Sequence, residues 1–170
     1  HYFQIQKILH LEVYKSIRIK KSDISVNLSL PEQYDDYLQN LTKKNRHELK
    51  RKKRKFADQV DSFELLESRE QETFNIFVSQ HKKSKGEKGK FMTKSIEAYF
   101  EELLNLDGWK IYYLNTDKGV ISTAFCYENN NGCYLYNSSR DNEFNSLNPG
   151  IVLNDLIIQR LIHNGKSFFD

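Results

Sequence analysis

Three consecutive residues, Asn148-Pro149-Gly150, have the types and order expected of an anion-binding turn at the start of a helix. Proline suits the first helical turn, because its φ is already helical and its missing N–H would have had no partner there. The remaining free N–H groups of such a turn receive phosphate or carboxylate groups. The sequence therefore predicts an anion site here. The same pattern also fits a strand–helix connection that binds no ligand.

The residues around this turn predict the elements that hold it. Gly165 follows the last helical turn as a stop signal, and the helix it ends has an apolar face at helical spacing. That face consists of Ile151, Leu153, Leu156, Ile157, Leu161 and Ile162. A strand at Tyr134–Ser138 precedes the helix, and a short strand ending at Asp170 follows it. Two strands joined by a crossover helix are expected to be parallel neighbours, with the start of the helix at the strand ends where ligands bind.

Upstream of Tyr134, the pattern is that of an antiparallel meander. The strands are expected at Trp109–Leu114, Val120–Tyr127 and Cys133–Asn137. Tight turns at Asp117–Gly119 and Glu128–Gly132 separate them, and the second turn is rich in residues that tolerate positive φ. A meander that leads into a strand–helix–strand unit, after a helical N-terminal half, predicts an α/β (α+β) fold with a mixed central sheet flanked by helices.

The N-terminal half is expected to be mainly helical. Helices are predicted from Pro31 to Leu41, from a Thr42 cap through Lys55, at Glu70–Gln80 and at Thr93–Leu106, and short strands at Glu12–Ile19, Ile24–Leu28 and Phe63–Leu66. The core stripe of the Thr93–Leu106 helix is expected to include Tyr99. His81–Lys90, HKKSKGEKGK, is interpreted as a mobile basic loop, either a lid or a plain solvated linker. Residues 1–25 are read as a leading edge strand or the remnant of a preceding domain, and residues 26–170 as one domain.

Positive charge is concentrated in one predicted helix. The chain of 170 residues has a net charge of +3, yet Thr42–Lys55 holds nine Lys or Arg residues against one Glu. Leu49 and Phe56 are its sparse core contacts, so most of this helix is expected to be exposed. Arg46, His47, Lys50 and Arg51 are the candidate binding residues on it. Three interpretations stay open: a solvated surface, a site for a polyanion such as tRNA, or contacts with the phosphates of an acyl-CoA or a lipid-linked acceptor.

Composition and motif content exclude several classes of protein. The sequence has no apolar run of transmembrane length and no signal-peptide pattern, so a cytoplasmic protein is expected. Cys126 and Cys133 flank a predicted turn and are expected to be buried reduced thiols rather than a disulfide. No metal-ligand spacing, nucleotide-binding loop, dinucleotide fingerprint or Ser-His-Asp set is present.

The motifs described so far resemble the GNAT acyltransferase superfamily. Asp141, Phe144, the Asn148-Pro149-Gly150 turn and the final Phe-Phe-Asp are most similar to its CelD-type branch, which is named for cellulose or exopolysaccharide biosynthesis and neighbours the Fem aminoacyl transferases of peptidoglycan. Upstream, Leu30-Pro31, Tyr37-Leu38 and NRHELKRKKRK at 45–55 resemble the Leu-Pro…Tyr-Leu…Arg-x-x-Leu-(Arg/Lys)-(Arg/Lys) signature of that branch. The branch usually has Ser-Pro-Gly, so Asn148 departs from it. The resemblance covers roughly residues 26–170.

The resemblance implies direct attack of an amine or hydroxyl acceptor on an activated acyl group, with an N–H of the Tyr134–Ser138 strand stabilising the oxyanion. Asn148, Pro149, Gly150 and Ile151 would receive the pyrophosphate of an acyl-CoA. They stand in place of the usual Arg/Gln-x-x-Gly-x-Gly/Ala loop, which leaves aminoacyl-tRNA open as the donor. No metal is implied.

Asp141, Asp170 and Tyr136 are the candidates for proton transfer on the same resemblance. For Asp141 the alternatives are a loop cap or an Arg140 partner, and for Asp170 a helix cap or a structural hydrogen bond. Tyr136 is expected to share a strand face with Tyr134, and a core aromatic with a solvated hydroxyl is its alternative interpretation.

The family pattern normally continues past Phe-Asp, so the C-terminal strands of the family are expected to be missing here, either because the chain is truncated or because a second copy or a partner domain completes the fold. The sequence thus predicts an acyl- or aminoacyltransferase of cell-envelope or polysaccharide metabolism. The alternative is a non-catalytic polyanion-binding module that uses the basic helix at 42–55.

Overall fold

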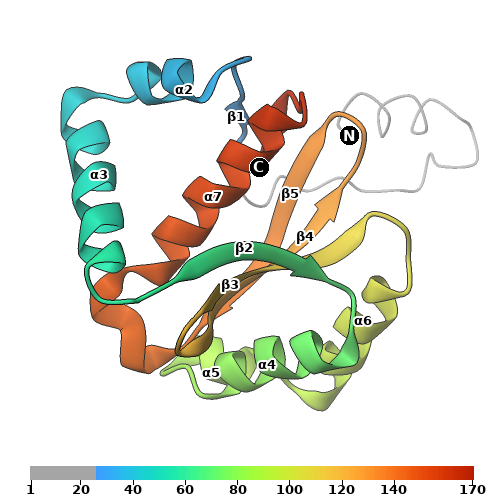
Figure 1. Cartoon of the computed structure of the whole chain (residues 1–170). Coiled ribbons are helices and arrows are strands. Elements are labelled where there is room, and N and C mark those ends of the chain that lie inside the picture. The colour runs from blue at the N-terminus through green and yellow to red at the C-terminus, as the bar shows by residue number, and fades with distance from the viewer. Residues whose placement is uncertain (1–25) are drawn as a thin grey trace, which may run out of the picture.

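A computed structural model of the chain describes residues 26–170. They form one six-stranded sheet with the strand order β1-β6-β5-β4-β3-β2, and Figure 1 shows helices on both of its faces. The strands are β1 (Leu28–Ser29), β2 (Phe63–Ser68), β3 (Trp109–Thr116), β4 (Gly119–Glu128), β5 (Gly132–Arg140) and β6 (Phe168–Phe169). The helices are α2 (Tyr34–Asn40), α3 (Lys43–Ala57), α4 (Gln71–Lys82), α5 (Glu87–Phe91), α6 (Lys94–Leu104), the 3-10 helix η2 (Asn142–Leu147) and α7 (Pro149–His163). The strand predicted at Glu12–Ile19 and the assignment of residues 1–25 fall outside the described residues.

The centre of the sheet is the predicted meander. β3, β4 and β5 pair antiparallel in sequence order, and β2 joins β3 at one edge. The β4–β5 turn does not rely on positive φ as expected. Instead, the Asn129 side chain accepts hydrogen bonds from the Asn131 and Gly132 N–H groups at 2.9 and 3.0 Å, which closes the turn. The mixed sheet flanked by helices confirms the predicted fold class.

The strand–helix–strand unit is also present. α7 connects β5 to β6, and the two strands are parallel neighbours with Gly132 opposite Phe168 and Cys133 opposite Phe169. Beyond β6 the sheet ends in β1, which pairs antiparallel with β6 through Leu28 and Phe169. The helix begins at Pro149, the first-turn position predicted from the sequence.

The sheet separates two apolar clusters. In Figure 1, α7 crosses one face while α4, α5 and α6 lie on the other. The first cluster combines α2, α3 and α7 with the sheet. The second is aromatic, and Phe77, Phe100 and Phe125 at its centre are 0 to 1% exposed. Cys126 and Cys133 are buried free thiols, as expected. Tyr99, predicted to be a core residue, is instead 46% exposed, and its ring meets the aromatic cluster at Phe100, with the two ring centroids 6.2 Å apart.

The structure corrects the prediction of a mobile loop at His81–Lys90. α4 continues through His81 to Lys82, and the short helix α5 follows after a few residues. His81 is 1% exposed, because its ring packs against Phe77 and Phe91. Its Nδ1 donates a hydrogen bond to the Lys88 carbonyl at 3.2 Å, and its Nε2 lies 2.8 Å from Asn137 Oδ1. The segment is therefore a packed helical connection that is tied to β5.

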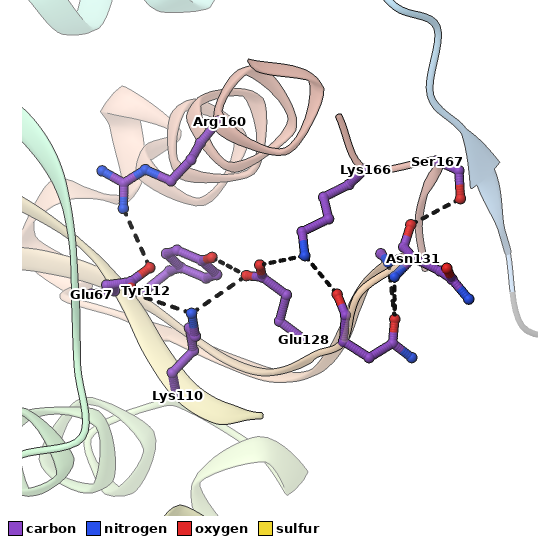
Figure 2. Close-up of polar contacts among 10 residues, drawn as sticks. Glu67, Lys110, Tyr112, Glu128, Asn131, Arg160, Lys166 and Ser167 are labelled. Atoms are coloured by element: carbon purple, nitrogen blue, oxygen red, sulfur yellow. Dashed lines mark hydrogen bonds and ion pairs between the residues drawn. The ribbon is translucent and has the colours of Figure 1, made fainter. Parts of the chain in front are cut away.

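A network of charged side chains lies at the end of the sheet where β5 begins, beside a cavity of about 570 Å³. Figure 2 shows Glu128 at its centre, where it accepts a hydrogen bond from the Tyr112 hydroxyl and lies 3.5 Å from Lys110 and 3.3 Å from Lys166. Burial raises the pKa of the Glu128 carboxyl, but Tyr112 and the two lysines outweigh it and lower the pKa below its usual range. Lys110 also pairs with Glu67 at 3.2 Å. Because opposite charges are paired, we assign this network a structural role.

The Tyr112 hydroxyl gives the fold an expected sensitivity to alkaline pH. Burial and, next, the hydrogen bond to Glu128 raise the pKa of Tyr112 well above its ordinary value of 10.0. Above pH 10 the unfolded chain therefore loses a proton that the folded chain keeps, so the free energy of unfolding falls by about 1.4 kcal/mol per pH unit from this residue. Urea unfolding at pH 9, 10 and 11 measures the slope. Tyr112→Phe should have a shallower slope; an unchanged slope would show that Tyr112 ionises alike in both states.

Candidate functional site

The candidate site begins where β5 and β6 diverge. Their pairing ends after Cys133 and Phe169, with a last hydrogen bond from the Leu135 N–H to the Asp170 carbonyl at 2.7 Å. Within residues 26–170, no strand lies beside the rest of β5 on that side. The C-terminal part of β5, beyond this divergence, therefore has a free edge, where backbone N–H and C=O groups are open to a ligand.

A β-bulge lies at the same point. Leu135 pairs with Cys126 and Asn137 pairs with Phe125, so Tyr136 is an extra residue without a partner on β4. An extra residue reverses the alternation of all the side chains that follow it. Asn137 consequently faces α4, where it contacts His81, and Ser138 faces α7. The bulge thus directs polar side chains of β5 toward the start of α7.

The start of α7 supplies the second wall. Asn148 adopts the left-handed conformation with φ 55°, and its carbonyl accepts hydrogen bonds from the Ile151 and Val152 N–H groups at 3.0 and 3.4 Å. Pro149 has no N–H, and the Gly150 N–H has no acceptor among the described residues. A Cβ built on Gly150 would have no atom within 4 Å, so a ligand can approach the backbone closely here. One free N–H at a positive helix end is a suitable anion contact.

A cavity of about 300 Å³ lies between these two walls. It is lined by Ser122, Ser138, Arg140, Asn148, Gly150, Ile151, Leu153 and Asn154. The cavity therefore brings together three of the four predicted donor-binding residues: Asn148, Gly150 and Ile151. Pro149 is buried beside them at the start of the helix. Ser138 and Arg140 were not predicted as site residues, because regular alternation along β5 would have turned them to the face of Tyr136.

The candidates for proton transfer lie around the cavity but do not line it. Tyr136 is at the bulge, 51% exposed, with its ring against Phe100 and Trp109 on the opposite face of the sheet. Partial burial and a hydrogen bond with Tyr99 raise the pKa of Tyr136 above its ordinary value of 10.0, which makes its hydroxyl a weaker acid. Asp170 follows β6 at the divergence, where its N–H donates to the Cys133 carbonyl at 3.0 Å.

Asp141 takes the capping contact that was its alternative interpretation. Its carboxylate accepts a hydrogen bond from the Glu143 N–H at 3.0 Å and caps η2. A catalytic role for Asp141 stays a prediction.

The predicted polyanion-binding residues lie on α3, away from this cavity. Thr42 caps α3 as expected and accepts from the Asn45 N–H at 3.2 Å. Arg46 donates to the Leu38 carbonyl at 3.2 Å, while Arg51 forms hydrogen bonds of 2.7 and 2.9 Å with Glu48. The Arg51 hydrogen bond lowers the pKa of Glu48 to about 2. His47 and Lys50 are exposed. Two of these four side chains, Arg46 and Arg51, therefore already have hydrogen-bond partners, and polyanion binding here stays a prediction.

The comparisons with known proteins agree with this geometry. The model of the acetyltransferase (GNAT) domain family matches residues 43–170. Comparison with curated proteins gives no match. Among solved structures, the chain is similar to a conserved protein of unknown function from Bacteroides thetaiotaomicron VPI-5482, with 12% identity and a TM-score of 0.56. The similarity covers 85% of this chain and 51% of that chain, so the chain spans about half the length of that protein.

Residues 26–170 contain neither a metal-ligand cluster nor a membrane-spanning helix. No group of three or more His, Cys, Asp or Glu side chains is placed to hold a metal ion. In the same residues, no helix has the length and apolar character needed to span a membrane.

Proposed function

We propose that this chain, which belongs to the acetyltransferase (GNAT) domain family, transfers an acyl group from a CoA thioester to an amine or hydroxyl acceptor. The observation that carries this proposal is the free edge of β5 beside the open start of α7, with a cavity of about 300 Å³ between them. This arrangement offers backbone donors to the acyl carbonyl and to a phosphate at the same time. Both are needed to orient a thioester that carries a diphosphate.

The residues present fit such a donor. The Gly150 N–H and the helix dipole of α7 would bind the diphosphate, and the missing Cβ of Gly150 permits close approach of the backbone. The free edge of β5 next to the bulge at Tyr136 would hydrogen-bond the acyl carbonyl and stabilise the oxyanion as it forms. When bound, the CoA thioester supplies the activated acyl group. The chain contributes mainly the orientation of the two reactants.

Proton transfer is assigned to the groups at the divergence of β5 and β6. Tyr136 stays the candidate that protonates the departing thiolate through its hydroxyl, although the raised pKa makes it a weak acid and its ring lies on the face of the sheet opposite the cavity. Asp170 is the candidate that accepts the proton of the acceptor, because it follows β6 at the point where this strand leaves β5. We retain Asp141 as a weaker candidate, because its carboxylate already caps η2.

The acceptor class is proposed from the sequence motifs alone. The Leu-Pro…Tyr-Leu…Arg-x-x-Leu signature and the Asn148-Pro149-Gly150 turn support membership of the CelD-type branch, and through it a relation to the Fem aminoacyl transferases. We therefore propose an acceptor in cell-envelope or polysaccharide metabolism.

A thermal-shift titration with acetyl-CoA, longer acyl-CoAs and free CoA tests the proposed donor. A ligand at 100 times its dissociation constant stabilises the folded state by about 2.7 kcal/mol. For a domain of this size we expect an increase in melting temperature of roughly 5 to 10 °C. A folded protein that no thioester stabilises would contradict the CoA assignment. Binding of aminoacyl-tRNA, weakened by neutralising Lys50, would then favour the alternative donor.

A further inference from the structure

A second cavity, of about 310 Å³, lies between the α4–α5 connection and the end of β5. Its lining residues come from two segments far apart in the sequence: Ser84, Lys85 and Lys88 on one side, and Arg140, Asn142 and Asn145 on the other. The lining contains three cations, two amides and a hydroxyl, and no carboxylate. The basic segment that the sequence suggested as a lid or linker thus forms one wall of a positively charged cavity.

The three cations have no partner of opposite charge. Among residues 26–170, neither Lys85, Lys88 nor Arg140 forms an ion pair, and the nearby Glu87 pairs instead with Lys90 at 3.1 Å. The Arg140 guanidinium uses only its Nε, which donates to Asn145 Oδ1 at 2.6 Å. Its terminal N–H groups stay available for a ligand. Uncompensated like charges around one cavity repel each other, and an anion between them would relieve that repulsion.

Burial further destabilises the charged form of one of the two lysines, Lys88. The pKa of Lys88 is lowered by burial and, next, by the charge of Arg140. Both effects oppose the charged form of the Lys88 amine, so this form is less stable in the cavity than in water. A bound anion would restore the charged form through a direct contact.

The frame of the cavity is fixed by hydrogen bonds between its walls. Asn142 Nδ2 donates to the Lys83 carbonyl at 2.7 Å and so joins η2 to the α4–α5 connection. The buried His81 donates to the Lys88 carbonyl at 3.2 Å and holds α5 in place. Asn145 Nδ2 donates to Asn142 Oδ1 at 3.3 Å. The cations are therefore carried by a preorganised scaffold, which lowers the cost of ordering a ligand.

We propose that this cavity is a phosphate-binding subsite, formed by Lys85, Lys88 and Arg140, for a phosphate monoester of one of the two substrates. A phosphate dianion offers three oxygens, which match two ammonium groups and the planar fork of an arginine. Arg140 also lines the cavity at the start of α7, so the two cavities share one side chain. Assignment of the phosphate to a substrate rests on the proposed acyl transfer. Phosphate binding itself does not.

Titration of the purified chain with inorganic phosphate at low ionic strength tests the subsite directly, because exposed charges are then least screened. We follow binding by amide chemical shifts, with Lys85→Gln/Lys88→Gln as the test variant. The control is Lys90→Gln/Lys94→Gln, which removes the same charge from two exposed lysines outside the cavity. The test variant should bind phosphate about tenfold more weakly or worse, and the control within about twofold of wild type. Absence of binding to wild type, or equal losses in the two variants, would overturn the proposal.

Comparison of CoA with 3′-dephospho-CoA identifies the source of the phosphate. If the donor supplies it, wild type will bind CoA more tightly than 3′-dephospho-CoA, and the test variant will bind both alike. If wild type binds inorganic phosphate but does not distinguish the two donors, the subsite serves a phosphorylated acceptor. Because inorganic phosphate is titrated without any thioester, failure of acyl transfer would leave the phosphate result intact.

Discussion

Replacing Gly150 with glutamate is expected to reduce kcat/KM for acyl transfer roughly 100-fold or more, because small displacements of a reacting group have effects of that size. A Cβ at Gly150 has no atom within 4 Å, so the first atom of a new side chain meets no neighbour. That side chain would enter the cavity between α7 and β5 and place a carboxylate against the donor's phosphates. Steady-state kinetics and titration with CoA measure the loss.

The same substitution should not destabilise the protein, which separates the site from the fold. An acidic residue in the first turn of a helix is stabilising by about 0.3 to 1 kcal/mol. The matched control is Gly150→Ala, which also stabilises a helix, by about 0.5 to 1 kcal/mol, but adds only a methyl group. We expect both variants to melt no lower than wild type, and only the glutamate to abolish transfer. If Gly150→Glu transfers acyl groups at the wild-type rate, the donor does not bind at the start of α7.

Replacing Lys53 with alanine is expected to destabilise the fold by about 3 kcal/mol, the cost of removing one partner of a buried ion pair. Lys53 Nζ lies 2.5 Å from Asp155, whose side chain is 2% exposed. Without Lys53, the Asp155 carboxylate would keep only neutral donors, namely the Tyr34 hydroxyl at 2.6 Å and Gln159 at 2.8 Å. Denaturant unfolding at pH 7 measures the change, which corresponds to roughly 10 °C in melting temperature.

Lys50→Ala is the matched control, because Lys50 lies one turn earlier on the same helix and is exposed. It removes the same charge and the same side chain, and we expect its effect to stay within about 0.5 kcal/mol. Equal effects of the two substitutions would mean that the pair with Asp155 does not hold α3 against α7.

The sequence predicts the elements of this fold well, because period and turn chemistry are local properties. The meander of β3, β4 and β5, the Thr42 cap and the parallel pairing across α7 were all predicted. Lys53 shows the limit of such patterns. It belonged to a basic run expected to be solvated, yet its partner Asp155 is 102 residues away, and no local pattern links the two. The same limit applies to His81, because its side chain contacts Asn137 on β5, 56 residues away.

The candidate site was predicted in part. The helix start at Gly150 follows from proline and glycine preferences, so the sequence indicates it. Ser138 and Arg140 could not be predicted, because the alternation from Tyr134 places them on the wrong face unless the bulge at Tyr136 is known. A bulge depends on how two strands pair and leaves no mark on either strand alone.

The pairing of β1 with β6 also determines the order in which the molecule folds. Leu28 and Phe169 are opposite each other although they are about 140 residues apart, so their contact closes a loop much longer than those of the meander. The hairpins of β3, β4 and β5 are expected to form early, and the edge that contains β6 is expected to form last. Because β6 diverges from β5 at the opening of the candidate cavity, a chain in which β6 has not yet paired is expected to have most of its sheet but an incomplete candidate site. If the proposed acyl transfer takes place at this site, we expect refolding chains to gain enzyme activity only at the last step of folding.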